Sequence, residues 1–255
     1  MCSSDLYRHR GPARVFVDER AAIRAVKGGD TQLAAIKPND VIVLIGNGPS
    51  GTGMQETAQV TTALKYLPWG KLVALVTDGR FSGLSTGACI GHVGPEALDN
   101  GPIGRVRDGD VIEIVLDRVN LVGSVNVVGI GGVGVGRRGA GDDSSSDAGT
   151  DDPNDASVDD ANRALNDAIN GAPDSAPNSA ARSDRDDERN LAIDACTAVL
   201  RERTPHPDLA PHPSLPDDTR LWAALQRASG GTWAGCVYDV DRIVDALDRA
   251  SRPAQ

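Results

Sequence analysis

The sequence predicts a mixed α/β fold in which a β-rich, barrel-like or sandwich core packs against a few helices. Short β-prone runs follow one another closely between residues 102 and 128, separated by turn residues. Two further apolar runs, 41–45 and 71–77, are typical of strands that are buried on both faces, as in a layered α/β unit. This density of strands favours a barrel or sandwich over a doubly wound sheet.

The N-terminal elements are expected in the order strand, helix, strand. Residues 14–17 form a short β-prone run, and Asp18 can cap a helix over 19–26 that two glycines end. The helix carries apolar residues on one face, which indicates that it packs on the core. The apolar strand 41–45 follows after a polar, proline-containing turn.

A Gly-rich loop, GNGPSGTGM over residues 46–54, precedes a helix that is expected over 56–67. Such loops bind phosphate when their backbone N–H groups turn toward an anion at a helix N-terminus. A P-loop is excluded, because Met54 follows the last glycine where that motif needs Lys. The dinucleotide pattern GxGxxG does match, but it contains Pro49, and a tight strand-to-helix connection is the simpler interpretation.

The strand 71–77 leads into the stretch VTDGRFSGLSTGACIGHVGPEAL, residues 76–98. A loop directly after a buried strand is a common place for a ligand or a reacting group. Eight polar or reactive residues stand among its glycines: Asp78, Arg80, Ser82, Ser85, Thr86, Cys89, His92 and Glu96. Beyond this stretch the runs 102–106, 110–116 and 121–128 are expected to be strands.

An acidic, low-hydrophobicity segment divides the chain. Thirteen Asp and three Arg between Gly139 and Asp187 account for the whole net charge of −10. We expect residues 131–187 to be a disordered insertion, because almost nothing in them can be buried to offset the entropy of ordering. A solvated linker is the simplest interpretation, and an acidic arm that binds a basic partner is the alternative. The remainder of the chain is neutral without a basic stripe, which argues against nucleic-acid binding.

The domain organisation follows from this division. Residues 1–130 are expected to form the folded domain, and residues 188–255 a helical C-terminal segment that packs on it. Helices are expected over 188–203, from Asp217 or Asp218 after a Pro-rich link, and after Asp239 as an N-cap.

The spacing of the cysteines and the composition of the first residues indicate in which cellular compartment the chain is expected. Cys2, Cys89, Cys196 and Cys236 are too far apart for a CxxC metal knuckle, and a chain of this size does not depend on disulfides. Reduced thiols are therefore expected. The opening residues have no apolar signal region, and no run is long enough to cross a membrane, so a cytoplasmic location is expected.

The run TDGRFSGLSTGACIGHVGPEAL, with GPSGTGMQE upstream and NGPIGRVRDGDVIEI downstream, closely resembles the C-terminal domain of the dihydroxy-acid and sugar-acid dehydratases, the IlvD/Edd family. The match covers roughly residues 11–129. The wording GNGPSGTGM and the tail LPDDTRLWAALQRASGGTWAGCVYDVDRI are most similar to the sugar-acid branch typified by D-xylonate dehydratases. The acidic segment between the two blocks resembles nothing in that family.

The resemblance implies a fold, a reaction and two cofactors. The fold is a β-rich swivelling β/β/α domain with flanking helices. The reaction is dehydration of an aldonate such as D-xylonate to a 2-keto-3-deoxy acid, with an iron–sulfur cluster as Lewis acid for the leaving hydroxyl and Mg²⁺ on the carboxylate. These metals suit the chemistry, because the C2 proton is weakly acidic and hydroxide is a poor leaving group.

The resemblance also implies roles for individual residues. Ser82 falls on the serine that removes the C2 proton as an alkoxide, and Glu56 on a Mg²⁺ ligand. Ser85 and Thr86 lie where the family holds the substrate carboxylate. Asp78 and Arg80 are expected to position the loop. On the residues alone, Ser82 could be a plain turn residue and Glu56 a helix N-terminal carboxylate; His92 and Cys89 are interpreted as structural.

One departure from the family limits the expectation. The cluster cysteines, the other Mg²⁺ ligands and the modified lysine of the family belong to an N-terminal domain, and Cys89, Cys196 and Cys236 match none of those ligands. The chain is thus expected to be inactive without an N-terminal partner, with which it would form the complete enzyme, itself expected to be a homo-oligomer. The alternatives are a stand-alone module that binds a small acid or anion, and an inactive truncated remnant.

Overall fold

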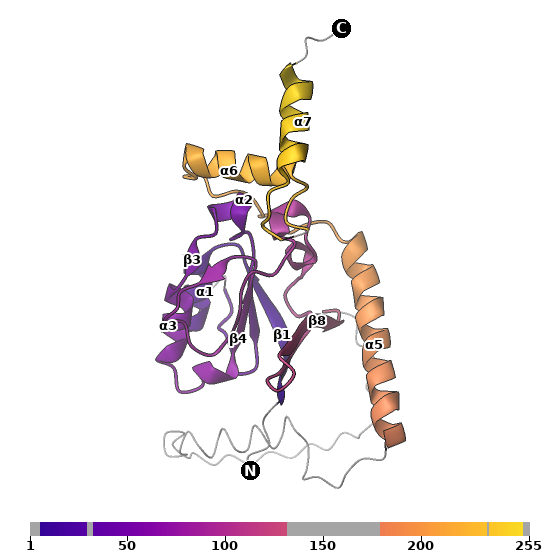
Figure 1. The fold of residues 1–255 in the computed structure, drawn as a ribbon. Helices are drawn as coiled ribbons and strands as arrows, with labels where there is room; N and C mark the ends of the chain where they lie inside the picture. Colours follow the sequence, from indigo (N-terminus) through magenta and orange to yellow (C-terminus); the bar gives the residue numbers. More distant parts are fainter. Residues whose placement is uncertain (1–5, 30–32, 132–178, 234, 252–255) are drawn as a thin grey trace, which may run out of the picture.

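The computed structural model describes residues 6–29, 33–131, 179–233 and 235–251 (Figure 1). Most of the predicted acidic insertion, 131–187, lies outside these residues. The helix expected over 188–203 is the element α5, Ser179–Glu202, which begins earlier than predicted. Residues 179–187 include few apolar residues, so the sequence shows no apolar stripe that would indicate the start of a helix there.

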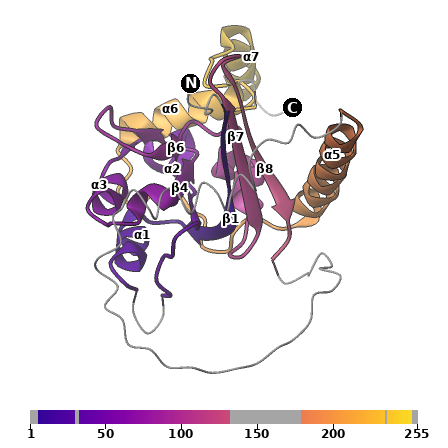
Figure 2. The same ribbon diagram turned by 90° about the horizontal axis from the view of Figure 1, so that it is seen from below.

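A six-stranded mixed sheet forms the centre of the fold and curls into a half-barrel (Figures 1 and 2). Its strand order is β6-β4-β2-β1-β7-β8. The first four strands in this order run parallel, and β7 and β8 are antiparallel to their neighbours. The strands are β1 Leu6–Phe16, β2 Val41–Leu44, β4 Ala74–Thr77, β6 Ala88–Ile90, β7 Val111–Asp117 and β8 Val122–Gly129. The α/β, barrel-like fold class is thereby confirmed.

Strand β1 is longer than the expected run 14–17, because its two halves pair with two different strands. Residues 6–12 pair antiparallel with β7, and residues 13–16 pair parallel with β2. The stretch Arg8-His9-Arg10 has no apolar residue that would indicate a strand in the sequence. In the structure its side chains alternate as in a strand, because His9 is buried while both arginines are exposed. Pro12, which lacks an N–H group, stands at the end of the β7 pairing, where one donor fewer is tolerated.

Two hydrophobic clusters cover the two faces of this sheet. On one face, α1 Glu19–Val26 and α3 Gln59–Lys65 pack over β2 and β4, as Figure 1 shows. Asp18 caps α1 by accepting from the N–H groups of Arg20 and Ala21, as predicted. Glu19 in turn accepts from the first N–H groups of α3, at 2.9 Å from Gln59 N. The other face holds the second cluster, built from alternate residues of the same strands.

Two expected elements are different in the structure. The helix predicted over 56–67 begins only at Gln59, and Glu56 lies in the short strand β3, Glu56–Thr57, which pairs with β5, Arg80–Phe81. The predicted strand 102–106 is instead the 3₁₀ helix η3, Pro102–Arg105. Proline at the first position of a helical turn fixes φ and needs no N–H partner, which favours this outcome.

Short elements connect the strands at the ends of the sheet. The Gly-rich loop contains the one-turn helix α2, Pro49–Thr52, and η1, Gly70–Leu72, precedes β4. The turn η2, Ala97–Asp99, follows the loop after β6 and lies against η3.

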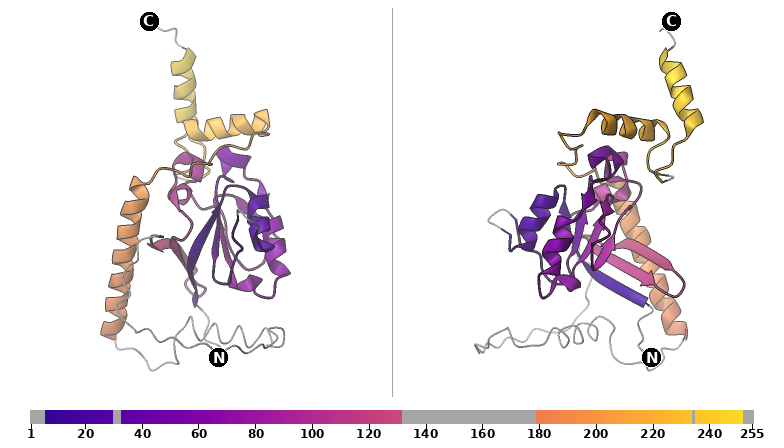
Figure 3. Two further views of the ribbon diagram at one scale, coloured as in Figure 1. Left: turned by 180° about the vertical axis from the view of Figure 1, so that it is seen from behind. Right: turned by 60° about the vertical axis from the view of Figure 1, so that its left-hand side comes forward.

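Three helices complete the C-terminal segment. Helix α5 runs along β8 at the edge of the sheet, and α6, Asp217–Ala228, packs on α2. Helix α7, Val240–Ser251, contacts α6 and projects from the body in both views of Figure 3, with no buried residue. Among the helices that the structure describes, none combines the length and apolar character needed to cross a bilayer.

Candidate functional site

The Gly-rich loop 46–54 and the stretch 76–98 meet at the carboxyl ends of β2 and β4. Asp78 directly follows β4 and is only 2% exposed. Its carboxylate accepts from the N–H groups of Gly46 at 3.1 Å, Asn47 at 2.9 Å and Ala97 at 2.9 Å. Burial raises the pKa of Asp78 above its usual value, and the backbone hydrogen bonds oppose that rise. Asp78 therefore joins both loops to the end of the sheet.

Glu96 is the second buried carboxylate at this place, also 2% exposed. Both of its carboxylate oxygens lie within hydrogen-bonding distance of Ser50 N, at 3.1 and 3.0 Å, at the start of α2. A side chain at Gly48 would collide with Glu96, so only glycine permits this approach. Burial raises the pKa of Glu96 to about 6, with the nearby Asp78 charge adding to the effect.

These contacts decide between the two interpretations of the Gly-rich loop. The backbone donors of Gly46, Asn47 and Ser50 that could face an anion already donate to carboxylates of the chain itself. A side chain at Gly51 would also strike the carbonyl of Gly46, so the glycines serve close backbone packing. The loop is therefore a tight strand-to-helix connection, as the simpler interpretation predicted.

The C-terminal segment lies over the same loops. The Glu96 N–H donates to Thr232 Oγ1 at 2.8 Å, and Thr232 in turn donates to the Asp99 carboxylate from its backbone N–H. The N–H of His212 donates to Gly51 O at 2.8 Å. Residues more than a hundred positions away in the sequence thus hold the loop that carries Glu96.

Glu56 and Arg80 form the exposed part of the site. The parallel pairing of β3 with β5 places them opposite each other, and Arg80 Nη1 lies 3.0 Å from Glu56 Oε1. Their side chains are 45% and 49% exposed, respectively. Arg80 Nε also donates to Met54 O at 2.7 Å, which ties β5 to the end of the Gly-rich loop. Glu56 therefore presents its carboxylate to solvent beside a fixed cation.

Ser82 follows β5 directly, two residues after Arg80, and is half-buried. Its hydroxyl oxygen accepts from Leu84 N at 3.4 Å, and its carbonyl accepts from Ser85 N at 3.0 Å. Ser82 thus sits in a turn that begins where the pairing of β3 with β5 ends.

The structure does not bring Ser85 and Thr86 to Glu56. Ser85 Oγ lies 3.3 Å from Thr61 Oγ1 of α3. Thr86 is exposed and lines a cavity of about 380 Å³ near the amino end of β4, with Lys65 and Arg118. The pairing of Ala88 with Ala74 explains this position, because the loop returns to the start of β4 before β6 begins.

The described residues hold no group of three or more His, Cys, Asp or Glu side chains that could bind a metal ion alone. Cys89, Cys196 and Cys236 are free thiols in separate elements. Burial raises the pKa of Cys89 to about 11, which disfavours the thiolate that metal binding requires. His92 is exposed with a positive φ of 55°, and is therefore a turn residue.

The sequence interpretation did not assign a role to Glu96 or Thr232. Glu96 follows Pro95 in the loop, and no spacing rule connects it to Ser50, 46 residues earlier. Thr232 lies within a Gly-rich turn in the C-terminal segment. The one usable signal was Gly48 in the Gly-rich loop, since a glycine without a phosphate role indicates close packing by another group.

Comparison with known proteins identifies relatives for both parts of the chain. Residues 1–128 match the model of the dihydroxy-acid/6-phosphogluconate dehydratase C-terminal domain. D-xylonate dehydratases YagF and YjhG of Escherichia coli are 43% and 44% identical over 97% and 95% of this chain. A dihydroxy-acid dehydratase of a Nocardioides species is 51% identical, but over only 47% of the chain. The chain spans 28% of the length of YagF and YjhG and 20% of the Nocardioides protein.

Proposed function

We propose that this chain, which belongs to the dihydroxy-acid/6-phosphogluconate dehydratase family, forms the C-terminal part of a hydro-lyase that dehydrates a sugar acid to a 2-keto-3-deoxy acid. The similarity to the two D-xylonate dehydratases extends over nearly the whole chain, whereas the similarity to the dihydroxy-acid dehydratase covers less than half. An aldonate such as D-xylonate is therefore the favoured substrate class.

The observation that carries the proposal is the pairing of β3 with β5, which sets Glu56 against Arg80 with Ser82 immediately beyond. Dehydration requires removal of a weakly acidic proton at C2 and departure of a poor leaving group at C3. A serine hydroxyl removes such a proton only where a cation stabilises its alkoxide. Ser82 is the base in this proposal, and the residue is partly exposed.

Glu56 fits a Mg²⁺ ligand in its chemistry but not as a complete site. Its half-exposed carboxylate offers the hard oxygen donors that Mg²⁺ prefers, and Mg²⁺ sites commonly combine one or two carboxylates with water and substrate oxygens. When bound there, Mg²⁺ would polarise the substrate carboxylate. Arg80 holds the Glu56 carboxylate in place through their ion pair. The three described cysteines fit no iron–sulfur cluster, so its ligands must come from other residues.

The remaining candidates have supporting roles in the proposal. Asp78 fixes the backbone of both loops, and Arg80 fixes Glu56. Ser85 and Thr86 remain proposed contacts of the substrate carboxylate, which requires the loop 82–87 to move from its place against α3 and β4 when substrate binds.

The proposed partner is the part of a dehydratase that corresponds to the remaining length of YagF and YjhG. It would supply the cluster ligands and complete the Mg²⁺ site, and the complete enzyme is proposed to be a cytoplasmic homo-oligomer. The stand-alone anion-binding module is disfavoured, because the donors of Gly46, Asn47 and Ser50 are already occupied. Without a partner, the chain would be inactive.

A reconstitution experiment tests the proposal. The chain is co-expressed under anaerobic conditions with the portion of YagF that precedes the aligned region, and 2-keto acid formation is measured on a panel of aldonates. We expect activity from the pair and none from either component. A fusion of the two segments is the control for weak association. Absence of activity from a folded, cluster-loaded fusion on every aldonate would overturn the proposal.

A further inference from the structure

A cavity of about 460 Å³ lies between the sheet and α5, on the face opposite α1 and α3. Its walls are mainly apolar side chains from β2, β4, β7, β8 and α5, among them Val43, Val76, Ile112, Val127 and Leu200. The volume lies within the range of small-molecule sites, which are commonly apolar with a few polar groups. Neither Glu56 nor Ser82 lines it.

Arg105 of η3 gives this cavity an unusual polar group. Its Nη1 donates to the carbonyls of Leu200 at 3.3 Å and Arg201 at 2.6 Å, which are in the last turn of α5. Its Nε is buried and has no hydrogen-bond partner, and it is the single such side-chain atom among the described residues. Buried donors without an acceptor are rare and costly, so such an atom calls for an acceptor supplied by another molecule.

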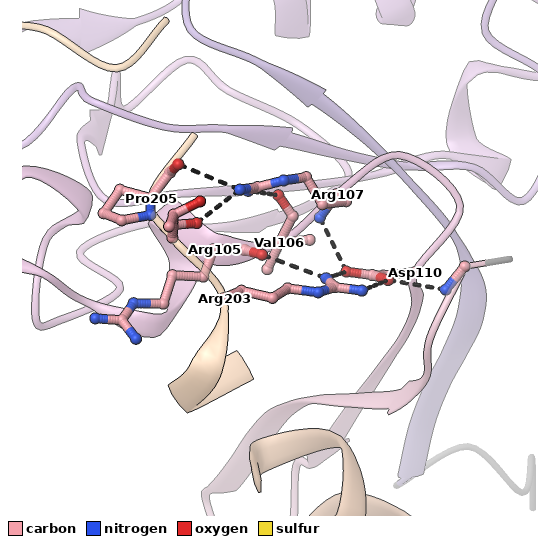
Figure 4. Close-up of polar contacts among 8 residues, drawn as sticks. Arg105, Val106, Arg107, Asp110, Arg203 and Pro205 are labelled. Carbon is pink, nitrogen blue, oxygen red and sulfur yellow. Dashed lines mark hydrogen bonds and ion pairs between the residues drawn. The ribbon is translucent and has the colours of Figure 1, made fainter. Parts of the chain in front are cut away.

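The charge around the cavity favours an anionic acceptor. Two nearby arginines are neutralised: Arg189 of α5 pairs with Glu113, and Arg203, just after α5, pairs with Asp110 at 2.5 Å. Figure 4 shows the Arg105 side chain directed away from the Asp110–Arg203 pair. In the described part of the chain, no carboxylate forms an ion pair with Arg105 or with Arg201, which also lines the cavity. The cavity thus combines mainly apolar walls with two arginines that form no ion pair with a carboxylate of the described residues.

We propose that this cavity binds an amphipathic monocarboxylate, whose hydrocarbon part packs on the valines of β4 and β8 while one carboxylate oxygen accepts from Arg105 Nε–H. The guanidinium is already held by the two carbonyls of α5, and its buried Nε becomes accessible to the ligand through a local shift of the cavity wall. Asn100 and Asn126 lie on the same wall and can donate to the second oxygen. The inference does not depend on the proposed dehydratase activity.

Three probes of equal length test the proposal on the whole chain. Octanoate, octan-1-ol and octylammonium are titrated below their micellar concentrations, with binding followed by calorimetry and by the fluorescence of Trp233, which lines the cavity. We expect octanoate to bind, octan-1-ol to bind at least about tenfold more weakly, and octylammonium not to bind, because only octanoate offers a charged acceptor.

Two variants locate the site. Arg105→Met should weaken octanoate binding about tenfold or more while leaving octan-1-ol binding nearly unchanged. Val127→Trp should fill the cavity and abolish the binding of both. The matched control is Arg227→Met, which removes an exposed arginine of α6. Circular dichroism confirms that each variant is folded, and if Arg105→Met unfolds, Arg105→Lys replaces it, because lysine keeps the charge but loses the Nε–H.

Several results would overturn the proposal. Equal affinity for octanoate and octan-1-ol would show an apolar cavity without an anion site. Equal affinity for octanoate and octylammonium would contradict the role of the two arginines. Octanoate binding that survives both Arg105→Met and Val127→Trp would place the ligand elsewhere. Lack of octanoate binding by the folded chain would refute the inference directly.

Discussion

The acidic residues at the candidate site lie in opposite environments. Asp78 and Glu96 are 2% exposed and accept hydrogen bonds from backbone N–H groups of the neighbouring loop. Glu56 is 45% exposed and faces one arginine. The buried pair is committed to the architecture of the loops, whereas the exposed carboxylate is available for a ligand. The residues that stabilise the loops are therefore different from the residue that is available to a ligand. Measurements of stability and of activity can test this difference.

The largest effect on stability is expected at Asp78. Asp78→Asn should lower the free energy of unfolding by about 3 kcal/mol, because an amide nitrogen cannot accept the N–H groups that one carboxylate oxygen now accepts. Urea denaturation followed by circular dichroism measures the change. Asp208→Asn, at a side chain that is 75% exposed, is the control and should change stability by less than about 0.5 kcal/mol. Similar values for both variants would contradict the structural role of Asp78.

Glu96 should give a pH-dependent effect of intermediate size. Burial raises its pKa from the usual 4.5 to about 6 in the folded chain, so the folded state binds the proton more tightly than the unfolded state. Its contribution to stability is therefore full below about pH 4.5 and is lost as the pH rises through about 6. Relative to Glu96→Gln, the wild type should lose about 2 kcal/mol between pH 4 and pH 7.

Chemical denaturation across this pH range checks the prediction for Glu96. Comparison with the variant removes the contribution of Asp78, whose pKa is shifted in the same direction. Parallel stability curves for the wild type and Glu96→Gln would show that Glu96 does not titrate in this window.

A smaller effect on stability is expected for the exposed ion pair. Glu56→Gln should lower the free energy of unfolding by no more than about 0.5 kcal/mol, because both side chains are about half exposed and solvent screens their attraction. In the reconstituted enzyme, the same variant should raise the Mg²⁺ concentration needed for half-maximal activity at least tenfold. A Glu56→Gln enzyme with wild-type Mg²⁺ dependence would remove Glu56 from the proposed metal site.

The sequence allowed much of the fold to be predicted and less of the site. Apolar runs at 41–45 and 71–77 identified the buried strands, because full burial on both faces leaves a continuous apolar pattern. The start of β1 and the strand β3 were missed, since their pairing partners lie elsewhere in the chain and leave no local pattern. Tertiary pairing overrode local preference in both.

The site shows the same division between local and distant information. The residues singled out in the stretch 76–98 include Asp78, whose place directly after a buried strand is visible in the sequence. The contact of Glu96 with Ser50 and that of Thr232 with Glu96 depend on segments that only the fold brings together. Likewise, nothing in the spacing revealed that Thr86 returns to the amino end of β4.

Ser82→Ala in the reconstituted dehydratase tests the central claim most directly, because it should have the smallest effect on stability and a very large effect on activity. Ser82 makes one long hydrogen bond, of 3.4 Å to Leu84 N, so the melting temperature should stay within about 1 °C of the wild type. Ser214→Ala, at an exposed serine, serves as the matched control. The account predicts a folded Ser82→Ala enzyme whose 2-keto acid formation falls by at least about a thousandfold. A folded Ser82→Ala enzyme with activity near that of the wild type would contradict it.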